Sequence, residues 1–205
     1  MKFIAIEGTD GSGKTTIRQY LFNKLSELSG TRPLATIPFS WLDPQSSCTI
    51  VNSKYGWEKY DENDIINAYV HDKELLYQKI IKPHLEYRDV IVDRYYVSDI
   101  VFHSIINNIS MSKTIDKYKS SQVGEPDIWI YVKTDPELAY ERIVKRNPNN
   151  IHKWEKRDLI KRFHERFNEV MSTIPPEKLI VLENNGSQFD LVEQLNNKVL
   201  NLITY

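Results

Sequence analysis

The feature that most constrains this chain is a glycine-rich segment near its start. It reads Gly8-Thr9-Asp10-Gly11-Ser12-Gly13-Lys14-Thr15 and fits the pattern G-x-x-x-x-G-K-[ST]. The strand-like run Phe3–Ile6 precedes it, and apolar residues at helical spacing follow it up to Gly30. Glycines let successive backbone N–H groups face one concavity, and the helix N-terminus adds its positive end there. The context therefore predicts a phosphate-binding loop between the first strand and the first helix of an α/β fold, rather than a surface turn that happens to contain a lysine.

Three side chains at the end of this loop have expected roles. Lys14 is placed to follow the developing charge on the β- and γ-phosphates of a nucleotide, and the Thr15 hydroxyl is placed to ligate the Mg²⁺ that bridges them. Thr16 is expected to assist. The loop thus predicts a nucleoside triphosphate and Mg²⁺ as ligands.

Four further apolar runs of strand length recur along the chain, separated by segments long enough for helices. They are Leu34–Ile37, Val90–Val92, Ile128–Val132 and Leu179–Leu182. This alternation is typical of a parallel α/β sheet. We expect helices over 61–84 and 98–108. A further helix should start at Asp135-Pro136-Glu137 and run to about Arg146. A break at Asn147–Asn150 should follow, and then an amphipathic helix within Lys153–Glu169.

Composition limits the classes of protein to consider. The 205 residues are 40% hydrophobic, which suits one domain over 1–205. With 27 basic and 28 acidic residues interspersed, the broad positive field of a nucleic-acid-coating protein is missing. No run approaches the roughly 18 apolar residues of a membrane span, and the chain starts directly with a strand, so we expect a cytoplasmic protein without a signal peptide. We assign no function to the single cysteine, Cys48.

A second functional position follows the third apolar run. Asp93 ends the strand Val90–Val92, and this hydrophobic strand with a terminal acid is the Walker-B pattern. Such an acid can hold a metal ion through water, and the neighbouring Arg94 offers a fork suited to a substrate phosphate. A surface Asp–Arg pair after a strand is the alternative, and the phosphate loop favours the functional interpretation.

Several motifs together resemble the thymidylate kinase family over nearly the full length. They are Phe3-Ile4-Ala5-Ile6-Glu7 with the phosphate loop, Ile81-Lys82-Pro83, Asp93-Arg94-Tyr95 followed by Ser98, Gly124-Glu125-Pro126-Asp127, and Asp135-Pro136-Glu137-Leu138-Ala139 followed by Glu141-Arg142. The resemblance implies a three-layer α/β/α sandwich with a five-stranded parallel sheet, the adenylate-kinase-like P-loop NTPase fold. It also implies Mg-assisted transfer of a phosphoryl group from ATP to dTMP, and a homodimer.

The resemblance assigns residues to ATP and to the acceptor nucleotide. ATP would lie over the phosphate loop, with Arg142 packed on the adenine and Asp10 near the acceptor's sugar. The ATP-binding set would be Gly8, Asp10, Gly11, Ser12, Gly13, Lys14, Thr15, Thr16 and Arg142. The acceptor-binding set would be Tyr69, Lys73, Arg94, Ser98, Phe102 and His103. The bulk of Tyr95 and Tyr96 near the sugar hints at deoxyribose.

Some of these positions depart from the family pattern. Tyr69 can stack on the base, but Lys73 stands where an arginine usually reads the base edge, and a lysine lacks the planar fork. Phe102 and His103 replace an aromatic residue and a glutamine, so that His103 either faces the base or is a satisfied helical histidine. The stretch Thr36–Trp41 lacks the arginine that usually contacts the acceptor phosphate.

The segment 146–158 resembles the family's lid. Members with glycine at the position of Gly11 supply a catalytic cation from the lid, and Lys153 occupies the place of that cation, with Arg146 and Arg157 as alternatives. A solvated basic helix face is the structural alternative. A lid cation acts only when the lid closes over the transferring group.

Two other functions remain open on the sequence alone. A kinase of the same fold could act on another deoxynucleoside monophosphate, a deoxynucleoside or a different small metabolite. A nucleotide-binding switch protein is the alternative from another class. The loop Glu183-Asn184-Asn185-Gly186 after the last strand lacks the Lys and Asp of the N-K-x-D guanine motif, which argues against a GTPase.

Overall fold

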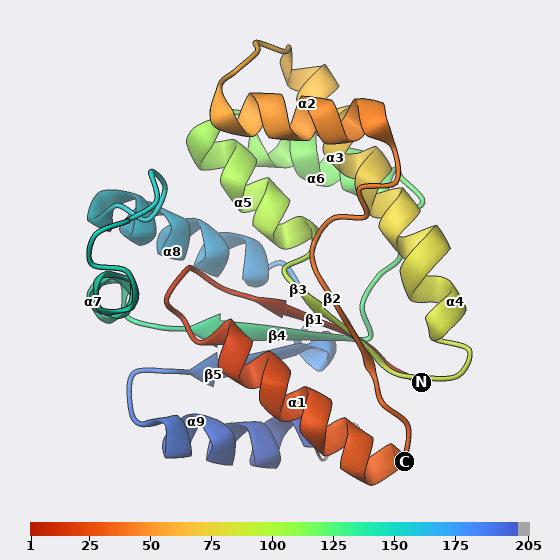
Figure 1. Cartoon of the computed structure of the whole chain (residues 1–205), viewed down its shortest axis with the longest axis vertical. Helices are drawn as coiled ribbons and strands as arrows, with labels where there is room; N and C mark the ends of the chain where they lie inside the picture. The colour runs from red at the N-terminus through yellow and green to blue at the C-terminus, as the bar shows by residue number, and fades with distance from the viewer. Residues whose placement is uncertain (201–205) are drawn as a thin grey trace.

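A parallel five-stranded sheet forms the centre of the protein in a computed structural model that describes residues 1–200 (Figure 1). The strand order is β2-β3-β1-β4-β5, and every neighbouring pair is parallel. The strands are β1 (Phe3–Glu7), β2 (Leu34–Thr36), β3 (Val90–Asp93), β4 (Ile128–Lys133) and β5 (Leu179–Glu183). Each of the five expected apolar runs therefore forms a strand.

Helices cover both faces of this sheet. Helices α1 and α9 lie along one face, and α3, α5 and α8 pack against the other (Figure 1). The α-helices are α1 (Lys14–Ser29), α2 (Pro44–Tyr55), α3 (Glu62–Leu75), α4 (Lys82–His84), α5 (Tyr96–Ile106), α6 (Met111–Lys119), α7 (Pro136–Arg146), α8 (Arg157–Met171) and α9 (Gln188–Leu195). The π-helical segments Leu76–Ile81 and Asn196–Leu200 and the 3₁₀ turn Pro176–Lys178 complete the elements.

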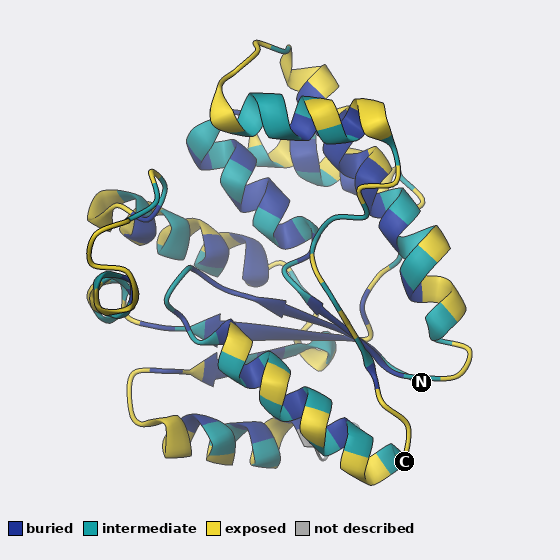
Figure 2. Ribbon diagram, viewed as in Figure 1, coloured by how far each residue is buried: buried dark blue, intermediate teal, exposed yellow. Residues whose placement is uncertain are grey.

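The strands are apolar because both faces of the sheet are covered. All five residues of β1 are buried, and five of the six in β4 are buried (Figure 2). Successive side chains alternate between the two cores: Phe3 and Ala5 face α3 and α5, whereas Ile4 and Ile6 face α1 and α9. This packing fixes the direction of β1, and therefore the place where the glycine-rich loop leaves the sheet.

Most helix boundaries follow local signals in the sequence. Helix α1 ends at Ser29 and is capped by Gly30, which adopts the left-handed conformation at φ 68°. Helix α7 begins as expected, because the Asp135 side chain accepts hydrogen bonds from the N–H groups of Glu137 and Leu138 at 2.9 and 3.3 Å. Helix α7 ends at Arg146, and the break before α8 is present.

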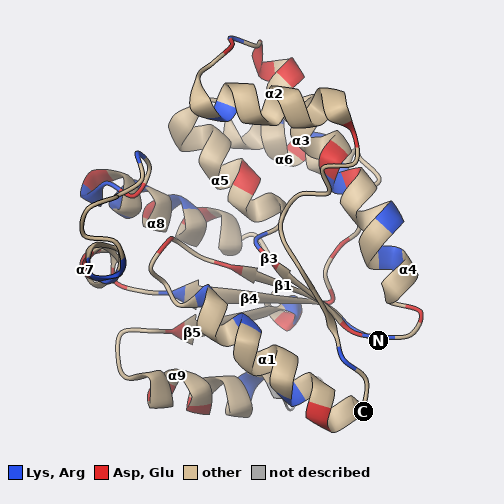
Figure 3. Cartoon of the chain, viewed as in Figure 1, with Lys and Arg blue, Asp and Glu red and all other residues tan. Residues whose placement is uncertain are grey.

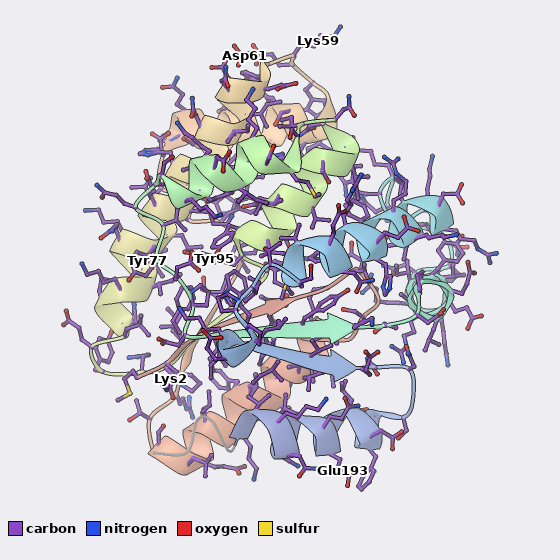
Figure 4. The ribbon with its side chains drawn as sticks, turned by 180° about the vertical axis from the view of Figure 1, so that it is seen from behind. Lys2, Lys59, Asp61, Tyr77, Tyr95 and Glu193 are labelled. Atoms are coloured by element: carbon purple, nitrogen blue, oxygen red, sulfur yellow. The ribbon has the colours of Figure 1, made fainter. Side chains whose placement is uncertain are left out.

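The long helix expected over 61–84 is interrupted by a π-helical segment. Here Tyr77 lies against Gly124 so closely that a Cβ on that glycine would lie 2.0 Å from the ring. The ring of Phe3 lies near those of Tyr77 and Tyr95, with centroid separations of 6.2 and 5.3 Å. Figure 4 shows Tyr77 on the helical segment after α3, and Tyr95 where β3 leads into α5. This aromatic group holds α5 above the sheet.

Candidate active site

The phosphate loop lies between β1 and α1, where its glycines allow the backbone to approach neighbouring elements. Gly8, Gly11 and Gly13 have φ angles of 145°, 76° and 97°. A Cβ added at Gly11 would lie 2.2 Å from the Ala139 carbonyl oxygen, and one at Gly8 would lie 2.5 Å from the Val132 carbonyl oxygen. A larger residue at Gly11 would displace either the loop or the start of α7, and one at Gly8 would displace either the loop or the end of β4.

Lys14 is the first residue of α1, and its side chain folds back over the loop. Its Nζ donates to the Thr9 carbonyl oxygen at 2.6 Å. Burial, together with the positive charge of Arg94, lowers the pKa of Lys14 to about 8. A nearby phosphate would raise this pKa, so the site favours an anionic ligand that holds the ammonium charged. Thr15 and Thr16 follow in the first turn, with Thr15 exposed.

Arg94 links the phosphate loop to α5. It adopts a left-handed backbone with φ 72°. Its Nη1 donates to the Gly8 carbonyl oxygen at 2.9 Å and to the Ser98 hydroxyl at 3.1 Å, while Nη2 contacts the Asp10 carboxylate at 2.5 Å. Burial favours a higher pKa for Asp10, but the charges of Arg94 and Lys14 outweigh it and lower the pKa to about 2. Asp10 and Arg94 therefore form an ion pair on the wall of the site.

Glu7, the last residue of β1, holds the chain that follows Arg94 by accepting hydrogen bonds from it. The sequence analysis assigned no role to this residue. Its carboxylate is fully buried and accepts from the Tyr95 N–H at 2.7 Å and from the Ser98 hydroxyl at 2.5 Å. Burial raises the pKa of Glu7 to about 7, despite these hydrogen bonds and the charge of Arg94. An acid at the end of an otherwise apolar strand was the available sequence signal.

A cavity of about 270 Å³ opens beside the loop and the Asp10–Arg94 pair. Of the residues predicted to bind the acceptor, Tyr69, Arg94, Ser98 and Phe102 line it. Its other lining residues are Thr9, Asp10, Pro38, Phe39, Lys54, Asp99, Trp154, Phe163 and Phe167. One end of this cavity is therefore charged and continuous with the phosphate loop, and the remaining wall is largely aromatic.

Tyr69 forms the aromatic wall together with Phe39, whose ring meets it edge to face at a centroid separation of 5.7 Å. Lys73 and His103 are fully buried, and neither lines the cavity. Lys73 forms an ion pair with Asp99 at 2.9 Å. His103 lies behind Tyr69 at 4.4 Å between ring centroids, with Nδ1 2.9 Å from the Asn107 amide nitrogen. The structure thus places these two residues behind the aromatic wall rather than on it.

The predicted metal and adenine residues come from β3 and α7. Asp93 ends β3 and forms an ion pair with Arg18 of α1 at 3.3 Å. Arg142 of α7 donates to the Asn184 carbonyl oxygen at 3.1 Å, and the Asn184 amide in turn donates to the Ser12 carbonyl oxygen at 2.7 Å. The loop after β5 is therefore tied to the phosphate loop at Ser12.

Basic residues of α7, the loop after it and α8 lie among acidic ones (Figure 3). Lys153 projects toward α2, where its Nζ donates to the Tyr55 carbonyl oxygen at 3.4 Å. The same Nζ lies 4.2 Å from the centroid of the ring of Trp154, its neighbour in the chain. Arg157 pairs with Glu137 at 3.4 Å. Arg146 pairs with Glu155 at 2.9 Å, and its charge also contributes to the low pKa of Asp10. Of the three candidate cations of this segment, Arg146 is therefore the one whose charge contributes to the low pKa of Asp10.

Comparison with known proteins identifies the family. The sequence profile described as thymidylate kinase matches residues 6–195. The chain belongs to the thymidylate kinase family. It is 29% identical over 167 residues to a probable thymidylate kinase of Archaeoglobus fulgidus, covering 81% of this chain and 80% of that protein. It is 27% identical to the thymidylate kinase of Caldicellulosiruptor saccharolyticus, covering 98% and 97% of the two chains.

A solved structure agrees on the fold. The crystal structure of the Ehrlichia chaffeensis thymidylate kinase superposes with a TM-score of 0.68 at 21% identity, covering 98% of each chain. The fold class, the family resemblance and the assignment as a nucleoside monophosphate kinase are confirmed. Within residues 1–200, no helix is both long and apolar enough to cross a membrane.

Proposed function

We propose that this protein transfers the γ-phosphoryl group of ATP to dTMP, with the reaction centred between the phosphate loop and the cavity. The observation that carries the proposal is the position of Arg94. Its guanidinium contacts the Gly8 carbonyl of the phosphate loop, the Asp10 carboxylate and the Ser98 hydroxyl, and it also lines the cavity. One side chain thereby connects the donor's phosphates with the acceptor.

ATP would bind with its phosphates over the loop. The backbone N–H groups of the loop and the Lys14 ammonium would hold the β- and γ-phosphates. Arg142, which already contacts the loop after β5, would pack on the adenine. The loop residues Gly8, Asp10, Gly11, Ser12, Gly13, Thr15 and Thr16 complete this proposed site.

The donor groups next to the loop suit Mg²⁺, which prefers oxygen ligands and keeps several waters. The Thr15 hydroxyl would ligate the ion directly, and the Asp93 carboxylate would hold it through water. Asp93 ends a strand adjacent to β1, in register with Ile6, so its carboxylate lies at the edge of the sheet from which the loop leaves. When bound, Mg²⁺ neutralises charge on the β- and γ-phosphates.

The transfer itself would be in line. An oxygen of the acceptor phosphate forms a bond to the γ-phosphorus while the bond to the bridging oxygen breaks, and ADP leaves. Lys14 and Arg94 stabilise the charge on the transferring group, and a lid cation adds to this when the lid closes. No covalent intermediate and no strong general base are required.

The base would occupy the aromatic part of the cavity. Tyr69, Phe39 and Phe102 offer apolar faces for a pyrimidine ring, and base–aromatic stacking contributes about 1–3 kcal/mol. Lys73 and His103 would act on the base indirectly, by fixing Asp99 and Tyr69 from behind.

Initial rates of ADP production test the proposal directly. Mg·ATP is offered with dTMP, dUMP, dCMP, dAMP, dGMP, UMP or thymidine, each at the same concentration. We expect dTMP to be preferred by about tenfold or more, equivalent to 1.4 kcal/mol in transition-state binding. Preference for another acceptor would contradict the assignment of dTMP as the substrate. No ADP production with any of these acceptors would contradict the proposed phosphoryl transfer.

Two broader expectations stay predictions. The family resemblance implies a homodimer, which light scattering of the purified protein would test. The sequence also predicts a cytoplasmic protein, which cell fractionation would test.

A further inference from the structure

Lys54 reaches the acceptor cavity from an element that the sequence analysis did not connect with the site. It lies in the last turn of α2 and lines the cavity. Its Nζ is 5.9 Å from the centroid of the Phe102 ring on α5 and 5.7 Å from that of the Trp154 ring on the lid. The ammonium is thus held between two aromatic walls of the same cavity.

Lys54 lacks a counter-ion in the part of the chain that the structure describes. Over residues 1–200 it forms no ion pair and donates no hydrogen bond, and its ring contacts are near the roughly 6 Å limit of cation–π attraction. Burial, together with the charge of Arg94, lowers the pKa of Lys54. A half-buried ammonium without a carboxylate partner is costly, and an anionic ligand would remove that cost.

The other charged residues that line the cavity are already paired. Asp10 forms an ion pair with Arg94, and Asp99 forms one with Lys73 at 2.9 Å. Asp99 and Asp10 only partly offset the effect of burial on Lys54. Lys54 is therefore the charged side chain of the described cavity wall that forms no ion pair, and the sign of its charge predicts an anion.

Arg94 alone is poorly suited to hold a phosphate dianion. A guanidinium has about five N–H donors, and Arg94 uses three of them on Gly8, Ser98 and Asp10. Its charge is also largely offset by Asp10. The stretch Thr36–Trp41, which leads from β2 toward the cavity, contains no basic residue. A second cation must therefore come from elsewhere.

We propose that Lys54 binds the phosphate of the acceptor nucleotide together with Arg94. This inference rests on the proposed function, because it requires a phosphorylated acceptor in the cavity. Lys54 thus replaces the arginine after β2 that usually contacts the acceptor phosphate and is missing from this chain. Its contact with the phosphate makes the site select nucleoside monophosphates over nucleosides.

The test compares two ligands that differ only in the phosphate. Binding of dTMP and of thymidine is measured by calorimetry for the wild-type protein, Lys54→Met, Lys54→Arg and the control Lys113→Met. Lys113 is a partly exposed lysine of α6 that pairs with Glu62. We expect Lys54→Met to weaken dTMP binding about tenfold or more, as for the loss of one charge-assisted hydrogen bond. Thymidine binding should not change, Lys54→Arg should retain dTMP binding, and the control should bind both ligands normally.

Other outcomes separate this inference from the proposed function. Equal weakening for dTMP and thymidine would show that Lys54 only shapes the cavity or contacts the nucleoside, and unchanged dTMP binding would overturn the inference while the proposed function stands. A wild-type protein that binds no nucleoside monophosphate would overturn both. Melting curves check that each variant is folded, and Lys54→Gln replaces the methionine variant if that one melts early.

Discussion

Replacing Glu7 with glutamine tests how the buried acid beneath the site couples to stability. The carboxylate of Glu7 has no exposed surface, and burial raises its pKa from 4.5 to about 7. Between these two pH values the folded protein holds a proton that the unfolded chain has released. The wild-type protein should therefore lose stability as the pH rises through this window. Glu7→Gln keeps an oxygen acceptor for the Tyr95 N–H and has no proton to release.

The expected size of this effect follows from the two pKa values. Linkage gives a loss of about 2.5 kcal/mol in the stability of the wild-type protein, relative to Glu7→Gln, between about pH 5 and pH 8. For a chain of this length that corresponds to roughly 5–10 °C in melting temperature. Urea unfolding at several pH values measures the difference, with the exposed Glu86→Gln as the matched control. A constant difference between wild type and Glu7→Gln over this range would refute the reasoning.

Three further changes test the loop and its neighbours. Gly11→Ala should destabilise the protein by about 2 kcal/mol or more, because Gly11 has φ 76° and the new Cβ would lie 2.2 Å from the Ala139 carbonyl oxygen. Urea unfolding measures this, and an unchanged midpoint would contradict it. Asp135→Ala should cost about 1 kcal/mol by removing the N-cap of α7, whereas Asp135→Asn should recover most of it. Lys14→Ala should lower kcat by roughly two to three decades in steady-state assays, and near-normal turnover would exclude its role.

The fold could be predicted because its signals are local. Each strand is an apolar run, and the boundaries of α1 and α7 are fixed by Gly30 and by Asp135 with Pro136. Helix α2 was not predicted. Asp43 and Pro44 start it in the same way as α7, and the Asp43 side chain accepts from the Ser46 N–H at 2.7 Å. Its sequence, PQSSCTIVNSKY, contains many residues with low helix propensity and no clear apolar stripe.

The site could be predicted only where a motif names its residues. The loop, Asp93 and Arg94 belong to such motifs, and Tyr69 was found by its distance along the chain from a motif. Lys54 and Trp154 line the same cavity but come from α2 and the lid, and only the tertiary arrangement brings them together. Nothing in the sequence of α2 distinguishes Lys54 from any other lysine in the last turn of a helix.

In the segment 146–158, a motif predicts where a lid lies but does not predict which of its cations reaches the phosphates. Lys153 matches the expected position, yet its ammonium lies over Trp154 and donates to the Tyr55 carbonyl of α2. It would have to leave both partners to reach a phosphate at the loop. Arg146 ends α7 and pairs with Glu155, and its charge already affects Asp10. In this structure Lys153 links the segment 146–158 to α2, and Arg146 is the candidate lid cation whose charge contributes to the low pKa of Asp10.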